Sequence, residues 1–159
     1  MPDSVCDTDE LIAPFAGVPV TLRGKRIHRG DTTMLELVPG SIERYAPALP
    51  ADGTPIPASN VEVLGHAIFT GEVVDSKCYL GVMNPGRLEV HRACAKRCIA
   101  GGIPPMLAAH GDDGKEAHLL LVKPDGRPFG DAILPLVGKT VTLEGRLERR
   151  DGLYYLYTE

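Results

Sequence analysis

Aromatic residues are scarce in this sequence, which has no tryptophan, 3 phenylalanines and 5 tyrosines among 159 residues. It also lacks any apolar run near the roughly 20 residues that a transmembrane helix needs, so we expect a soluble chain with no membrane span. Neither sign of charge forms a long block, and the net charge is −4. The basic surface of a general nucleic-acid-binding protein is therefore missing. We expect no nucleic-acid partner, whereas a protein partner fits this composition.

The first residues, MPDSVCDTDEL, lack the basic and apolar regions of a signal peptide. Taken as it stands, this start indicates a cytoplasmic protein, and a periplasmic location would follow if a leader had been removed ahead of it. Cys6 lies in this polar start, and we expect it to be a free or disordered thiol. The sequence also lacks a phosphate-binding loop, a dinucleotide-binding fingerprint and a zincin motif. We therefore expect no nucleotide cofactor and assign no catalytic residue.

Glycine and proline are abundant, with 18 and 14 residues, which favours turns and short strands over long helices. Four prolines lie between Ser41 and Asn60, and proline cannot pair within a central strand, so this segment is expected to be a linker. We therefore divide the chain into an N-terminal hairpin with a proline-rich linker, residues 1–60, and a domain of residues 61–159.

The two ends of the chain resemble each other at an offset of 121 residues, from Gly17 to Gly138. The first copy reads GVPVTLRGKRIHRGDTTML and the second reads GKTVTLEGRLERRDGLYYL. Each has the pattern of a strand, a glycine-containing turn and a second strand, which predicts a β-hairpin. Common ancestry and the general pattern of a half-buried hairpin explain this similarity equally well.

The residues between the two copies predict one long strand, one helix and further strands. Val61 to Asp75 has apolar residues at both alternating positions, as in a strand buried on two sides. Leu88 to Ala100 contains no glycine or proline and reads as a helix that ends at Gly101. A strand at Ala117 to Val122 and a short apolar stretch at Ala132 to Val137 precede the closing hairpin. This order predicts a mainly β protein with one inserted helix, an OB-like small barrel with an N-terminal β-hairpin arm or partial repeat; a two-layer α+β sheet is the alternative.

One group of residues carries the chemistry: Cys78, His91, Cys94 and Cys98 follow the spacing Cys-x12-His-x2-Cys-x3-Cys. On a helix the last three lie at i, i+3 and i+7 and face one side, and Cys78 would meet them from the end of the preceding strand. Three thiolates and an imidazole are ligands of a metal ion, with zinc favoured and copper or iron as alternatives. However, the helix rises roughly 10.5 Å between His91 and Cys98, which works against a regular four-ligand site.

Two other interpretations remain open. In the first, Cys78 forms a disulfide with Cys94 or Cys98 in a thiol–disulfide redox module. In the second, the cluster only holds the strand and the helix together in a structural or protein-interaction subunit. In the metal-binding interpretation the protein is an accessory or electron-transfer-associated one. Asp75 and Lys77 are then candidates for orienting the histidine ligand from behind.

The motif Asp-x-x-Cys, followed by His-x-x-Cys-x-x-x-Cys and a glycine, resembles that of a set of small, mostly uncharacterised bacterial proteins that are often exported or membrane-associated. In this sequence its members are Asp75, Cys78, His91, Cys94 and Cys98. The resemblance extends from about residue 61 to the C-terminus. It implies an OB-like barrel and a functional role for these five residues, and it implies no particular activity.

Overall fold

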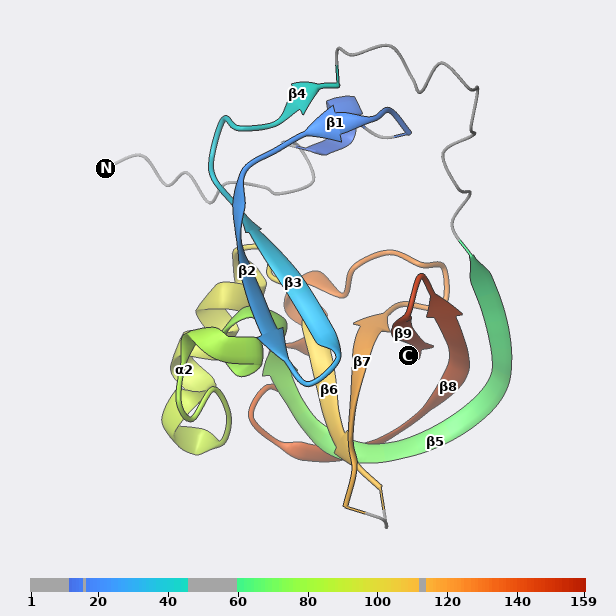
Figure 1. Cartoon of the computed structure of the whole chain (residues 1–159). Coiled ribbons are helices and arrows are strands. Elements are labelled where there is room, and N and C mark those ends of the chain that lie inside the picture. The colour runs from blue at the N-terminus through green and yellow to red at the C-terminus, as the bar shows by residue number, and fades with distance from the viewer. Residues whose placement is uncertain (1–11, 16, 46–59, 112–113) are drawn as a thin grey trace.

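The computed structural model describes residues 12–15, 17–45, 60–111 and 114–159. Its centre is a closed barrel of five strands, β5 (Val61–Asp75), β6 (Pro105–His110), β7 (Glu116–Val122), β8 (Thr140–Arg150) and β9 (Leu153–Tyr157) (Figure 1). The strands follow the order β5-β6-β7-β9-β8 around the barrel, in which β7 and β9 are parallel and the other neighbours antiparallel. The prediction of a mainly β, OB-like small barrel is confirmed.

Strand β5 forms with the bounds that the sequence predicted, and it is long enough to pair with two neighbours. It pairs with β8 up to Glu72 and with β6 from Gly71 onward. A Cβ at Gly71 would lie 2.5 Å from the carbonyl oxygen of Ala108, so this position requires glycine. The predicted burial on two sides is correct only at the end of the strand, where the neighbouring residues Val73 and Val74 are both buried, on opposite faces. The first six residues of the strand are exposed, because there the strand has only β8 beside it.

Aliphatic side chains from all five strands fill the barrel. Val73 of β5, Leu107 of β6 and Leu156 of β9 are completely buried, and Ala95 and Ile99 of the helix belong to the same apolar cluster. Full burial of a Val, Leu or Ile side chain contributes about 1.5–3 kcal/mol to folding. The helix is therefore attached to the barrel through the core itself.

Helix α2 (Glu89–Ala100) begins one residue after the predicted start and ends where predicted. The glycine pair that follows it stops the helix, since Gly102 adopts a φ of +93°, in the left-handed region that favours glycine. α2 lies between β5 and β6 in the chain. Within those ranges, no helix has the length and apolar character needed to cross a membrane.

One strand between the helix and the closing hairpin was not predicted from the sequence. The sequence does not predict β6, because Pro104 and Pro105 read only as a helix stop. Pro105 is the first residue of the strand, a position at which the missing N–H is tolerated. The apolar stretch at 132–137 forms no strand; it overlaps the short helix η3 (Gly130–Ile133), and Val137 makes a single bridge to Val73.

The N-terminal part is built on a hairpin, as predicted. Its elements are η1 (Ala13–Phe15), β1 (Val20–Thr21), β2 (Gly24–Arg29), β3 (Thr32–Leu37) and β4 (Glu43–Arg44). The β2–β3 register matches that of β8–β9 after the shift of 121 residues: Lys25 pairs with Glu36, as Arg146 pairs with Tyr157. The similarity between the two ends of the chain therefore extends from sequence to strand pairing.

This N-terminal hairpin packs on the outside of the barrel, across β6 and β7 (Figure 1). Ile27 and Met34 join a second apolar cluster with Tyr79 and Leu80, which follow β5 in the chain, and with buried side chains of β5 and β6. Thr32 Oγ1 lies 2.7 Å from Nδ1 of His118 in β7. Most of the predicted linker, residues 46–59, lies outside the described residues, and the domain boundary at residue 60 stays a prediction.

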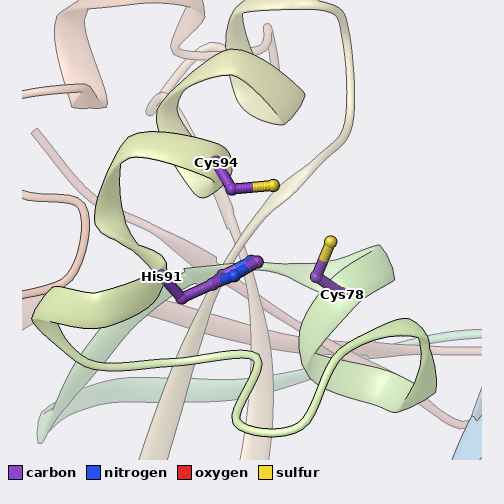
Figure 2. Close-up of side chains that lie close together, drawn as sticks. All are labelled: Cys78, His91 and Cys94. Carbon is purple, nitrogen blue, oxygen red and sulfur yellow. The ribbon is translucent and has the colours of Figure 1, made fainter.

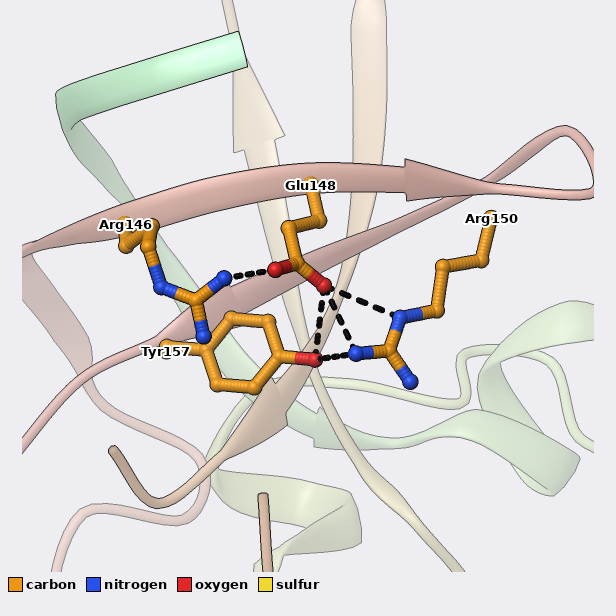
Figure 3. Close-up of polar contacts among 4 residues, drawn as sticks. All are labelled: Arg146, Glu148, Arg150 and Tyr157. Atoms are coloured by element: carbon orange, nitrogen blue, oxygen red, sulfur yellow. Dashed lines mark hydrogen bonds and ion pairs between the residues drawn. The ribbon is translucent and has the colours of Figure 1, made fainter. Parts of the chain in front are cut away.

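The outer face of β8 carries a buried carboxylate, Glu148, which is 4% exposed (Figure 3). Tyr157 Oη donates a hydrogen bond of 2.8 Å to Glu148, and the guanidinium of Arg150 approaches the same carboxylate oxygen at 2.7 Å. Arg146 forms an ion pair with the other oxygen and lies 3.9 Å above the Tyr157 ring. Two arginines and a hydroxyl compensate the buried charge, so Tyr157 serves the packing of this face.

Candidate metal centre

The predicted cysteine and histidine cluster lies in the first connection of the barrel, between β5 and β6. The chain leaves β5 at Asp75, forms the short helical turn η2 (Cys78–Val82), passes through a loop and returns along α2. In OB folds this connection is one of the two that border the ligand-binding face. The cluster therefore lies in a part of the fold that tolerates long insertions and commonly carries function.

The structure brings Cys78, His91 and Cys94 together, with their donor atoms within 4.8 Å of one another (Figure 2). His91 and Cys94 are three residues apart on α2 and so face the same side of the helix. Cys78 reaches them from the start of η2, immediately after the end of β5. The strand end and the helix face thus meet as the sequence spacing led us to expect.

Asp75, the last residue of β5, is completely buried beneath this group. Its Oδ1 accepts a hydrogen bond of 2.8 Å from the backbone N–H of Cys78. Its Oδ2 lies 3.0 Å from Nε2 of His91. One carboxylate therefore holds both the turn that carries Cys78 and the imidazole ring of His91.

Cys98 belongs to a second group, with Asp75 and Cys78, whose donor atoms also lie within 4.8 Å of one another. Among the described residues no such group contains both His91 and Cys98. The helix rise explains this separation, since two turns of α2 lie between these residues. The four predicted ligands therefore form two overlapping groups that share Cys78, and the thiol of Cys98 neighbours those of Cys78 and Cys94.

The three cysteines of the described ranges are free thiols, and Cys6 lies outside those ranges. Burial raises the pKa of the Cys78 thiol, and the Asp75 carboxylate raises it further. Burial followed by the same carboxylate also raises the pKa of Cys98. These thiols hold their protons, so a metal ion would have to displace them and its affinity would fall with decreasing pH.

The loop between η2 and α2 covers Cys78 on one side. A Cβ at Gly86 would lie 2.5 Å from the carbonyl oxygen of Cys78, so glycine is needed for this close approach. The same carbonyl accepts a hydrogen bond of 3.1 Å from the backbone N–H of Met83. The Met83 side chain is exposed.

Lys77, the other residue predicted to orient the histidine, interacts mainly with the N-terminal hairpin. Its Nζ lies 2.5 Å from Oε1 of Glu36 in β3. The hydrogen bond to Glu36 raises the pKa of Lys77. Lys77 therefore links the hairpin to the residue beside Cys78, and Asp75 is the residue that contacts the imidazole.

A polar network beneath the hairpin was not foreseen from the sequence. Tyr79 of η2 is completely buried and donates a hydrogen bond to Glu116. Nε2 of His118 lies 3.1 Å from Glu116, and its Nδ1 contacts Thr32 of the hairpin. Glu116 and His118 are two residues apart on a strand and share one face, which is the only sequence signal that could have suggested the pair.

The donor set of two thiols and an imidazole, with a third thiol nearby and a buried carboxylate behind the ring, suits a metal ion that prefers sulfur and nitrogen ligands. The same proximity of thiols suits disulfide chemistry. In comparisons with family models, with curated proteins and with solved structures, the chain matches none of them.

Proposed function

We propose that this protein binds one metal ion through Cys78, His91, Cys94 and Cys98, and that the ion is zinc. The observation that carries the proposal is the convergence of the first three residues, whose donor atoms lie within 4.8 Å of one another. Ligand atoms of a tetrahedral zinc ion lie roughly 3.3–3.8 Å apart, so small side-chain movements would suffice for coordination. Cys98, a neighbour of Cys78, would be the fourth ligand.

The ligand types support zinc over the alternatives. Thiolate and imidazole in a tetrahedral arrangement are typical of zinc, and they also suit copper and iron. Zinc has no redox chemistry, so a zinc centre supports a structural or accessory role. A copper or iron centre would instead support an accessory protein of electron transfer.

Asp75 supports the proposal because it fixes the histidine. Its carboxylate accepts a hydrogen bond from Nε2 of His91, at 3.0 Å, and so favours the tautomer in which Nδ1 has no hydrogen. Nδ1 is then the nitrogen that would bind the metal. A carboxylate behind a ligating histidine is the usual arrangement in metal sites, because it orients the ring and increases its basicity.

Metal analysis of the protein, purified without a nickel-affinity step, tests the proposal. We expect about one equivalent of zinc per chain and a thiolate-to-cobalt charge-transfer band after replacement by Co²⁺. Cys78→Ser should abolish binding, because Cys78 belongs to both groups of ligands. Cys98→Ser should weaken binding by roughly tenfold or more and leave it measurable.

Cys6→Ser is the matched control for these variants, since it makes the same substitution at a cysteine outside the motif, and it should bind metal like the unaltered protein. Less than about a tenth of an equivalent of any metal, after incubation with zinc under reducing conditions, would overturn the proposal.

A thiol–disulfide module is the second candidate, and the proximity of Cys78 to Cys98 favours it. In that reaction the two thiols would lose two electrons and two protons to the disulfide of a partner, which would become a dithiol, and an S–S bond would join the two residues. Mass spectrometry after incubation with oxidised glutathione would detect a loss of two hydrogens and a peptide linking Cys78 to Cys98. Full retention of reduced thiols under these conditions would exclude it.

The motif that begins at Asp75 also leads us to propose that the chain belongs with the small bacterial OB-like proteins that it resembles. The proposal predicts the same fold and the same ligand residues in those proteins. A structure of one of them with a different arrangement around the corresponding cysteines would contradict it.

A further inference from the structure

The candidate ligands differ sharply in their access to solvent. Cys78 and His91 are 5% and 3% exposed, and Asp75 is completely buried. Cys98 is half-buried, whereas Cys94 is exposed. A purely structural zinc site is normally closed by its ligands and the surrounding fold. In this cluster, one side is open, and Cys94 lies on that side.

The residues one turn before and one turn after Cys94 leave it uncovered. Val90, four residues earlier on α2, is 81% exposed, so nothing in the described part of the chain packs on this flank of the helix. Arg97, three residues later, is exposed, and its side chain has no hydrogen bond or ion pair to any described residue. Side chains at these spacings lie next to each other on a helix surface. An incoming group would therefore meet Cys94 beside an unpaired cation.

The surroundings of the cluster are positively charged in an otherwise acidic protein. From Asp75 to Cys98 the sequence has five basic and two acidic residues, a net charge of +3, whereas the whole chain carries −4. Glu36 of β3 pairs with one of these basic residues, Lys77. A local positive field of this kind attracts anions and raises their rate of encounter with the site. The charge therefore favours an anionic reaction partner at the exposed side of the cluster.

We propose that Cys94 is the residue that releases the bound metal when the metal is exchanged. The molecule that takes the metal from the protein, or delivers it, is anionic and is attracted by Arg97. This inference rests on the metal binding proposed above. A donor atom of the anionic acceptor bonds to the metal on the open side, and the metal–sulfur bond of Cys94 breaks. The thiolate of Cys94 then takes a proton from solvent, while Cys78 and His91 hold the metal until transfer is complete. No electron is transferred in these steps.

Stopped-flow removal of zinc from the loaded protein tests this inference, with EDTA as an anionic acceptor and the neutral chelator TPEN as a comparison. We expect the rate with each chelator to rise with its concentration, because the acceptor attacks before the metal leaves. Arg97→Glu should slow removal by EDTA at least about fivefold at low ionic strength and change removal by TPEN less than about twofold.

Lys96→Glu is the matched control, since it makes the same change of charge at the neighbouring residue. Lys96 lies about 200° around the helix from Cys94, on its other side. We expect its rates to stay within about twofold of those of the unaltered protein with both chelators.

A second measurement follows Cys94 without any metal. In the metal-free protein we expect the anionic disulfide DTNB to label Cys94 at least about tenfold faster than Cys78, as measured by peptide mass spectrometry. Removal rates independent of chelator concentration, or an equal effect of Arg97→Glu and Lys96→Glu, would overturn the inference while leaving metal binding intact. A protein that binds no zinc at all would instead overturn the proposed function, and the exchange inference with it.

Discussion

Replacement of Asp75 by asparagine separates the roles of the two oxygens of this carboxylate. The asparagine would keep the size of the side chain and an oxygen that can accept the hydrogen bond from Cys78, which measures 2.8 Å. The amide nitrogen would then face Nε2 of His91, where the carboxylate oxygen now lies at 3.0 Å. Because an amide N–H donates, the ring would favour the tautomer with hydrogen on Nδ1, the nitrogen that we propose as the metal ligand.

The expected loss follows from the geometry of that one bond. Removing the partner behind a ligating histidine typically weakens metal binding about 10- to 100-fold, or roughly 1.4–2.8 kcal/mol. In the metal-free protein the same substitution replaces one buried, charge-assisted hydrogen bond of His91 by a weaker one, which we expect to cost about 1–3 kcal/mol of unfolding free energy. We therefore expect Asp75→Asn to bind zinc more weakly and to unfold at lower denaturant concentration.

Competition with a chromophoric chelator at constant pH measures the zinc affinity, and urea unfolding measures the stability. Ser76→Ala is the matched control: Ser76 is also buried, and its hydroxyl has no partner among the described residues. Its removal should leave the affinity unchanged and alter the stability by less than about 0.5 kcal/mol. If Asp75→Asn binds zinc as tightly as the unaltered protein, Asp75 does not orient the ligand and our reasoning about the tautomer is wrong.

Two further predictions concern the N-terminal hairpin. Ile27→Ala should lower the free energy of unfolding by about 2 kcal/mol, because Ile27 is buried against the barrel. Leu35→Ala, at an exposed position of the same hairpin, should change it by less than about 0.5 kcal/mol. Equal effects of the two substitutions in urea unfolding would contradict the packing of the hairpin on the barrel. Glu116 should make the stability of the fold depend on acid pH. Burial raises the pKa of its carboxyl, but the hydrogen bonds from Tyr79 and His118 outweigh burial and hold the pKa below its ordinary value of 4.5. Because the folded-state pKa is the lower one, this carboxylate stabilises the fold above pH 4.5 and the contribution is lost as the pH falls through the folded-state pKa. The free energy of unfolding of Glu116→Gln, measured in urea, should therefore fall less with acid pH than that of the unaltered protein. If both fall equally as the pH is lowered, Glu116 does not stabilise the fold in this way.

The parts of the fold that the sequence predicted have strong and continuous patterns. The strand at Val61–Asp75 is long and rich in β-branched residues, and α2 is a run without glycine or proline. Strand β6 has six residues, begins with proline and contains two alanines, so neither β-branched content nor alternation distinguishes it. Its strand conformation comes from pairing with β5 and β7 on both sides, which local sequence does not encode.

The hairpin repeat shows a similar division between local and long-range information. The shared sequence pattern predicts two hairpins, and their strands pair in the same register. What each hairpin packs against is not predicted. β8 and β9 close the barrel between β5 and β7, whereas β2 and β3 form a separate two-stranded sheet outside it.

For the candidate metal centre, the sequence indicated which residues come together more readily than how they are arranged. The spacing of His91 and Cys94 requires only a helix, so their convergence follows from the sequence. The convergence of Cys78 depends on where β5 ends and how η2 turns, and both are set by the buried Asp75 carboxylate that bonds to the backbone of Cys78. The same carboxylate also contacts His91. A single side chain thus aligns the strand end with the helix face, and for this reason a change at Asp75 is a more sensitive test of the candidate centre than the loss of an exposed candidate ligand such as Cys94.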